Sequence, residues 1–164
     1  MTARSISIVG TILVTAYAAW AGLQMLVLNP LAAVPGKSLA EIEASMAQWG
    51  ESLGARWVVT LLAVGVALAV WLMVKAWRTE SPDPRLFGAG YLALLTLGAP
   101  AYFFISVGPG MALADSFAIS GGDHSPWAAP LYVISGAAAL GLVVLAATRS
   151  RPQALEAGNA GSRR

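Results

Sequence analysis

The sequence predicts an all-α integral membrane protein: a four-transmembrane-helix bundle with a short amphipathic outer helix between helices 1 and 2. Two observations predict this class. Of the 164 residues, 57% are hydrophobic and only 11% are charged, whereas a soluble domain has roughly 25% charged residues. The apolar residues also gather in four segments, each close to the roughly 20 helical residues that cross a bilayer. Because lipid cannot satisfy backbone polar groups, such segments must be helices. We expect a single membrane domain over residues 1–148.

The four predicted spans are bounded by charged or turn-forming residues. The first covers 6–28 and lies in a stretch without charge from Ser5 to Gly36. Ala16-Tyr17-Ala18 resembles a signal-peptide cleavage site, but the apolar run continues past it, which favours an uncleaved helix. The others cover 57–74, 86–107 and 127–148, and the prolines between the second and third predict a tight antiparallel turn.

Lysine and arginine predict the orientation. Eight of the ten lie on one side of the predicted bundle: Arg4, Lys75, Arg78, Arg85, Arg149, Arg151, Arg163 and Arg164. The other side has only Lys37 and Arg56. Because basic loops stay in the cytoplasm, we expect both termini there and the protein in the plasma (inner) membrane. Residues 149–164 have no apolar period and are predicted to form a mobile cytoplasmic tail.

The first outer loop predicts a helix over about 39–53. Ser38 followed three residues later by Glu41 forms a capping box, the signature of a helix start. An apolar stripe at spacings of three and four then follows: Leu39, Ile42, Met46, Trp49 and Leu53. We expect this stripe, Trp49 included, to be buried on the bundle or the membrane surface, or to contact a lipid or a partner.

Two further patterns concern packing. Pro100 predicts a kink in the third span, with Tyr102, Phe103 and Phe104 beside it as a possible lipid or quinone groove. Small residues let helices approach closely, within the chain or against a partner. They are Ala18, Gly22, Ala63, Ala67, Gly136 and Gly141.

The inventory of reactive residues is short. The chain has no cysteine and one histidine, and the predicted spans contain no Asp, Glu, Lys, Arg or His, which argues against an ion-coupled transporter. The third loop, 108–126, contains the only catalytic or metal-binding candidates, Asp115, Asp123 and His124. Ordinary solvated loop residues explain these three as well, so we expect no metal and no cofactor. The basic residues lie at span edges and form no stripe, so we expect the lipid bilayer, and not nucleic acid, as a partner.

One family has a similar plan. The predicted topology is similar to that of the lipoprotein signal peptidases. The shared features are four spans, both ends inside, an amphipathic outer helix after the first span and an aspartate before the last. Leu113-Ala114-Asp115-Ser116 resembles the segment around one aspartate of that family's dyad. The resemblance implies a membrane hydrolase, and a dyad needs two carboxylates that share a proton. The third span has no aspartate, so Asp123 would have to supply the second carboxylate from a different place.

Three functional hypotheses follow. The first is a non-catalytic accessory or assembly subunit of a larger membrane complex, which packs against other subunits or itself. The second is a membrane-embedded hydrolase that uses Asp115 with Asp123 or His124. The third is a lipid- or quinone-binding membrane protein with its groove at the Pro100 kink.

Overall fold

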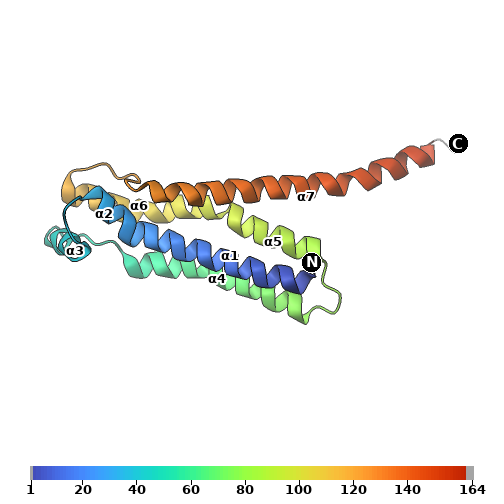
Figure 1. Cartoon of the computed structure of the whole chain (residues 1–164), viewed down its shortest axis with the longest axis horizontal. Coiled ribbons are helices and arrows are strands. Elements are labelled where there is room, and N and C mark those ends of the chain that lie inside the picture. Colours follow the sequence, from blue (N-terminus) through green and yellow to red (C-terminus); the bar gives the residue numbers. More distant parts are fainter. Residues whose placement is uncertain (1, 162–164) are drawn as a thin grey trace.

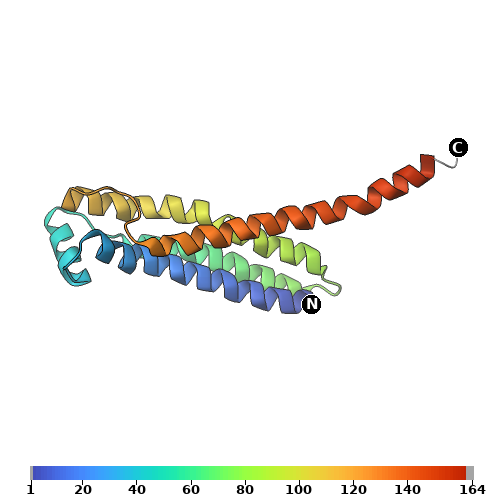
Figure 2. The same ribbon diagram turned by 45° about the horizontal axis from the view of Figure 1, so that its top comes forward.

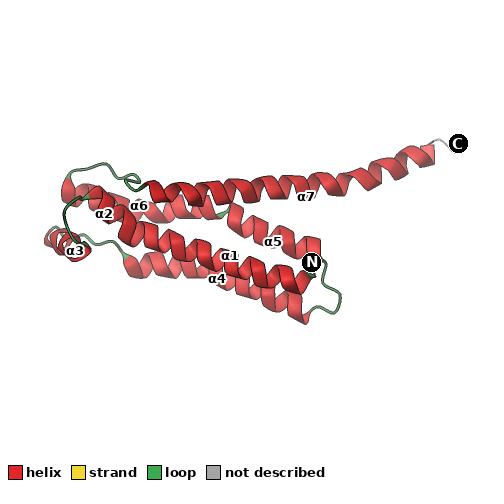
Figure 3. Ribbon diagram, in the orientation of Figure 1, coloured by secondary structure: helices red, strands yellow, loops and turns green. Residues whose placement is uncertain are grey.

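The chain folds into long helices joined by short loops. The computed structural model describes the backbone of residues 2–161 and the side chains of 2–148. The helices are α1 (Ala3–Leu23), a π-helical turn (Gln24–Leu28), α2 (Asn29–Ala33), α3 (Leu39–Gln48), α4 (Ala55–Arg78), α5 (Pro84–Thr96), α6 (Gly98–Phe117), a 3-10 turn (Pro126–Ala128) and α7 (Ala129–Gly161). Figure 3 shows only helix and loop over these described residues.

Four helical stretches are long and apolar enough to cross a membrane, which confirms the predicted fold class. They cover Ala3–Ala33, Ala55–Arg78, Pro84–Phe117 and Pro126–Thr148. The first and third are longer than the sequence pattern predicts, because neither Pro30 nor Pro109 ends its helix. The chain is therefore an all-α protein of the membrane-spanning kind.

The bundle is organised around α1, which packs against both α4 and α5, while α7 packs against α5. Tyr17, Tyr91, Tyr102 and Leu131 are among the large side chains of the core. α3 lies across one end of the bundle, near the loop 118–125, and the N-terminus and the α4–α5 turn lie at the other end (Figures 1 and 2).

The first span contains a π-helical turn directly before a proline. The amide of Asn29 donates to the carbonyl of Gln24, five residues back, which defines the π-helical turn. Pro30 follows directly and has no N–H to give to the preceding turn. Such single π turns are often found at functional sites. Here the turn buries two polar side chains, Gln24 and Asn29.

The third span is broken at Leu97, three residues before Pro100, and this confirms the predicted kink. Pro100 cannot donate to the carbonyl of Thr96. The hydroxyl of Ser135 on α7 also enters the helix ladder: it donates to the carbonyl of Leu95 at 2.8 Å and accepts from the amide of Ala99 at 3.0 Å. A side chain inserted between these two backbone groups is a recognised cause of kinks.

α3 begins as predicted and ends early. The Ser38 amide and hydroxyl both donate to a Glu41 carboxylate oxygen at 2.7 Å. The Ser38 hydroxyl, and then its amide, hold the pKa of the Glu41 carboxyl below its ordinary value. Ile42 and Met46 are fully buried in a cluster with residues of α6.

The prediction that this helix reaches residue 53 is wrong, and Trp49 is not buried against the bundle; its contact with the membrane surface or a partner stays a prediction. The helix ends at Gln48, and Gly50 turns the chain at a φ of 74°. Trp49 leaves the apolar stripe as a result and is 72% exposed within the chain. Leu53 is nevertheless buried, because the returning chain, and not a helical turn, brings it to the cluster.

The last helix is longer than its predicted span. α7 continues to Gly161, through most of the segment predicted to form a tail. The mobility of that segment stays a prediction, and residues 162–164 of the predicted tail lie outside the described residues.

Candidate functional site

The third loop is much shorter than predicted. α6 continues through Pro109 to Phe117, so Asp115 lies on a helix and is exposed. Pro109 costs α6 one backbone hydrogen bond, but Pro109 and Gly110 are buried there. The carbonyl oxygen of Gly121 occupies the space that a β-carbon on Gly110 would need. Tertiary packing against the loop therefore holds the helix beyond a residue that usually ends one.

The remaining loop, 118–125, is tied to the first span by buried amide side chains. Asn29 Oδ1 accepts from the backbone amide of His124 at 2.6 Å and from that of Ser125 at 3.3 Å. Gln24 Nε2 donates to the carbonyl of Ser125 at 3.4 Å, while its buried Oε1 has no hydrogen-bond partner among the described residues. Two side chains of the π-helical region thus fix the loop that holds two of the candidate residues.

Asp123 and His124 both make structural hydrogen bonds. The hydroxyl of Tyr102, a side chain only 1% exposed, donates to Asp123 Oδ1 at 2.6 Å. His124 Nε2 lies 2.9 Å from the carbonyl oxygen of Ser120. Asp123 therefore provides the partner that a buried tyrosine hydroxyl needs. The His124 side chain contacts the backbone of its own loop.

The three candidates do not form a metal site. Within the part of the chain that the structure describes, no three histidine, cysteine, aspartate or glutamate side chains are grouped so that they could hold a metal ion. Asp115 is carried by α6, whereas Asp123 and His124 are carried by the following loop. The hydrogen bonds of Asp123 and of the Asn29 side chain hold the loop 118–125 against the bundle.

The aromatic residues after Pro100 separate to two sides of α6. Tyr102 points into the core, whereas Phe103 and Phe104 are 56% and 74% exposed and meet edge to face, with ring centroids 5.6 Å apart. The exposed pair lies on the outer surface of the chain. The prediction of a lipid or quinone groove at this kink stays a prediction.

The small residues also divide into two sets. Gly22 and Gly141 face leucine side chains of α4 and α5, where an added β-carbon would lie 3.3 Å from the nearest side-chain atom, and Ala18 is half-buried. Ala63, Ala67 and Gly136 are exposed. The first set packs helices within the chain, and the second set is uncovered.

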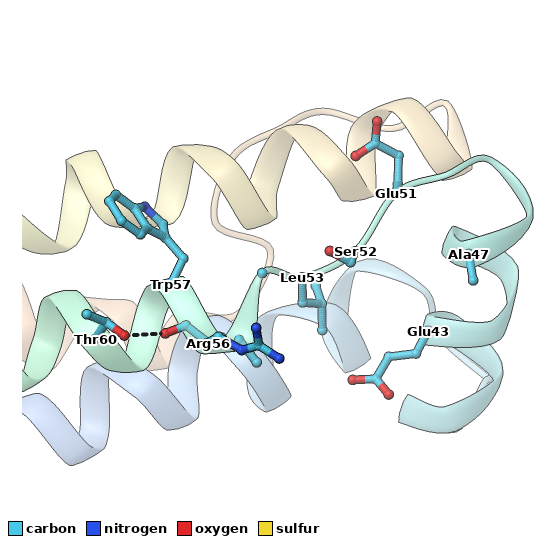
Figure 4. Close-up of a pocket in the computed structure, with 10 residues that line it drawn as sticks. Glu43, Ala47, Glu51, Ser52, Leu53, Arg56, Trp57 and Thr60 are labelled. Carbon is cyan, nitrogen blue, oxygen red and sulfur yellow. Dashed lines mark hydrogen bonds between the residues drawn. The ribbon is translucent and has the colours of Figure 1, made fainter.

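A cavity between α3 and the start of α4 is a feature that sequence reasoning missed. Its volume is about 590 Å³, and Figure 4 shows Glu43 from α3 and Arg56 from α4 pointing into the space between the two elements. Its lining residues are Glu43, Ala47, Glu51, Ser52, Leu53, Gly54, Ala55, Arg56, Trp57 and Thr60. The available signal was Arg56 itself, a basic residue in the first turn of a helix.

Comparison with known proteins adds no relative. No protein-family model, no curated protein and no solved structure matches this chain.

Proposed function

We propose that this chain is a non-catalytic accessory or assembly subunit of a membrane complex, which packs against another subunit or a second copy through α4. The observation that carries the proposal is the outward position of Ala63 and Ala67, one helical turn apart and uncovered by the rest of the chain. In lipid, helices associate mainly by close packing, and small residues four apart allow it.

The position of α4 supports this assignment. α4 is peripheral, and only 11% of its most apolar window is buried inside the chain. Its inner stripe is narrow: Val58, Ala69 and Ala76 are the residues of α4 that are buried. Most of the helix is therefore free to contact lipid or a neighbouring chain.

The polar groups at the α3 end also support a non-catalytic role. Asp123 holds Tyr102, and Asn29 holds the backbone of His124 and Ser125. A catalytic group must be free to exchange a proton with a substrate. These side chains instead maintain the loop, so their loss should affect local structure before it affects any reaction.

We also propose that the protein lies in the plasma (inner) membrane with both termini on the cytoplasmic side. The N-terminus and the α4–α5 turn share one end of the bundle (Figure 1), which gathers Arg4, Lys75, Arg78 and Arg85 there. Arg4 and Lys75 lie over the rings of Trp77 and Trp71, at 5.7 and 5.6 Å from the ring centroids. Basic and aromatic residues together are typical of a cytoplasmic membrane boundary.

The assembly proposal is tested by the size of the native complex. The protein should migrate well above its 16.9 kDa monomer when native membranes are solubilised mildly and run on a native gel. Ala63→Leu should shift it to the monomer, whereas Val143→Leu, at a similarly exposed position on α7, should not. A variant carrying Asp115→Asn, Asp123→Asn and His124→Gln should keep the large assembly. If wild-type protein migrates as a monomer, or Ala63→Leu leaves the assembly intact, the proposal is wrong.

A further inference from the structure

The cavity between α3 and α4 lies where an apolar span meets a polar loop. One wall is α3, with Glu43 and Ala47, and the other is the start of α4, with Arg56, Trp57 and Thr60. The apolar part of α4 begins directly below it, since Trp57 is the first residue of a long hydrophobic run. Exposed tryptophans at such places sit at the level of lipid headgroups. The cavity therefore opens at the membrane–water boundary.

One side of the cavity suits an anion. The N-cap residue of α4 is Gly54, which has no side chain to cap the helix, and the first turn contains no acidic residue. It contains Arg56 instead. A guanidinium beside the positive end of a helix dipole is unfavourable unless a negative group lies nearby, and uncapped helix N-termini bind phosphate through their free N–H groups.

The other side suits a cation. Glu43 extends from α3 toward Arg56 across the opening, whereas Glu51, which also lines the cavity, points its carboxylate away from that space (Figure 4). Over the described residues, the Glu43 carboxylate and the Arg56 guanidinium do not form an ion pair, which would need an N–O distance of 4.0 Å or less. The Glu43 carboxylate opposite the Arg56 guanidinium disfavours an occupant with only negative charge. The two groups fit one that presents a phosphate and an ammonium together.

We propose that this cavity binds the headgroup of a phosphoethanolamine lipid. The phosphate would lie against Arg56 and the start of α4, and the ammonium would donate hydrogen bonds to the Glu43 carboxylate. The acyl chains would run along the exposed apolar face of α4 below Trp57. The cavity is widely open to its surroundings, and its volume of about 590 Å³ has room for a headgroup. A bilayer lipid, unlike a soluble zwitterion, satisfies both the polar and the apolar side of the boundary.

The test is a lipid titration of the delipidated full-length protein, followed by native mass spectrometry. We expect dioleoyl-phosphatidylethanolamine to bind about tenfold more tightly than dioleoyl-phosphatidylglycerol, the scale of one charge-assisted hydrogen bond. Arg56→Gln and Glu43→Gln should each remove that preference. Arg85→Gln, an exposed arginine at the other end of the bundle, is the matched control and should keep it.

Three results would overturn the proposal: equal binding of the two lipids, unchanged preference in both variants, or equal loss in the control. Free phosphoethanolamine, added as a competitor, should displace the lipid poorly. Tight binding of this soluble zwitterion would assign the cavity to a soluble ligand instead. Both substituted side chains are exposed, so the fold should persist, and circular dichroism of each variant checks this. If Arg56→Gln does not fold, Glu43→Gln alone decides the outcome.

Discussion

Replacing Gly98 by alanine should destabilise the bundle through a single added methyl group. A β-carbon at this position would lie 2.7 Å from Cε1 and Cζ of Tyr17 and 2.9 Å from its hydroxyl oxygen. The ring cannot move aside easily, because the Tyr17 side chain is buried and its hydroxyl lies 3.2 Å from the Ser135 hydroxyl oxygen. Overpacking of this kind costs about 1–3 kcal/mol, whereas alanine gains up to about 1 kcal/mol over glycine in a helix. Gly98 is the first residue of α6, where little of this helix-interior gain applies, so the expected net loss is about 1–3 kcal/mol.

The matched control is Gly136→Ala on α7. No atom lies within 4 Å of the position that its β-carbon would take, so only the helix-propensity gain of up to about 1 kcal/mol remains. Equilibrium unfolding by sodium dodecyl sulfate in mixed micelles, followed by circular dichroism, measures both variants. The reasoning predicts opposite signs. Equal shifts in the two variants, or a Gly98→Ala protein as stable as the wild type, would refute it.

Three other predictions concern hydrogen bonds. Ser135→Ala should cost about 1–3 kcal/mol in the same unfolding assay, because a buried carbonyl and amide lose their partner. The control, Ser106→Ala at an exposed hydroxyl, should cost little. Equal losses in the two variants would contradict this prediction. Asn29→Ala should speed hydrogen exchange at the His124 amide, and unchanged protection would show that the loop is held otherwise. Because the folded-state pKa of Glu41 is lowered, its contribution to α3 is complete above the ordinary glutamate pKa and is lost as pH falls through the lowered value. Helicity of α3, followed by amide exchange, should drop at acidic pH in the wild type and be pH-independent in Glu41→Gln.

Local signals predicted the fold well. The four spans follow from hydropathy and length alone, because a bilayer demands about 20 apolar residues per crossing. The start of α3 was predictable because Ser38 and Glu41 satisfy each other within four residues of chain. Its end was not, because the apolar stripe continued past Gly50 while the backbone turned away.

The site was less predictable because its contacts join distant segments. Pro100 marked the kink, but nothing in the sequence linked it to Ser135 on another helix. Pro109 looked like the end of the third span, and only the close approach of Gly110 and Gly121 shows why the helix continues. The chemistry of Asp123 marks it as a candidate, but the sequence pattern places its partner, Tyr102, in a separate aromatic groove.

The central claim is that the outward face of α4 contacts another protein and not only lipid. The chain has no native cysteine, so a thiol-reactive photo-crosslinker can be attached to Ala63→Cys and, as the control, to Val133→Cys on the exposed face of α7. Both proteins are then illuminated in native membranes and analysed by mass. The account predicts a protein adduct of one defined mass from Ala63→Cys and only lipid adducts from Val133→Cys. Lipid adducts alone from both positions would contradict it.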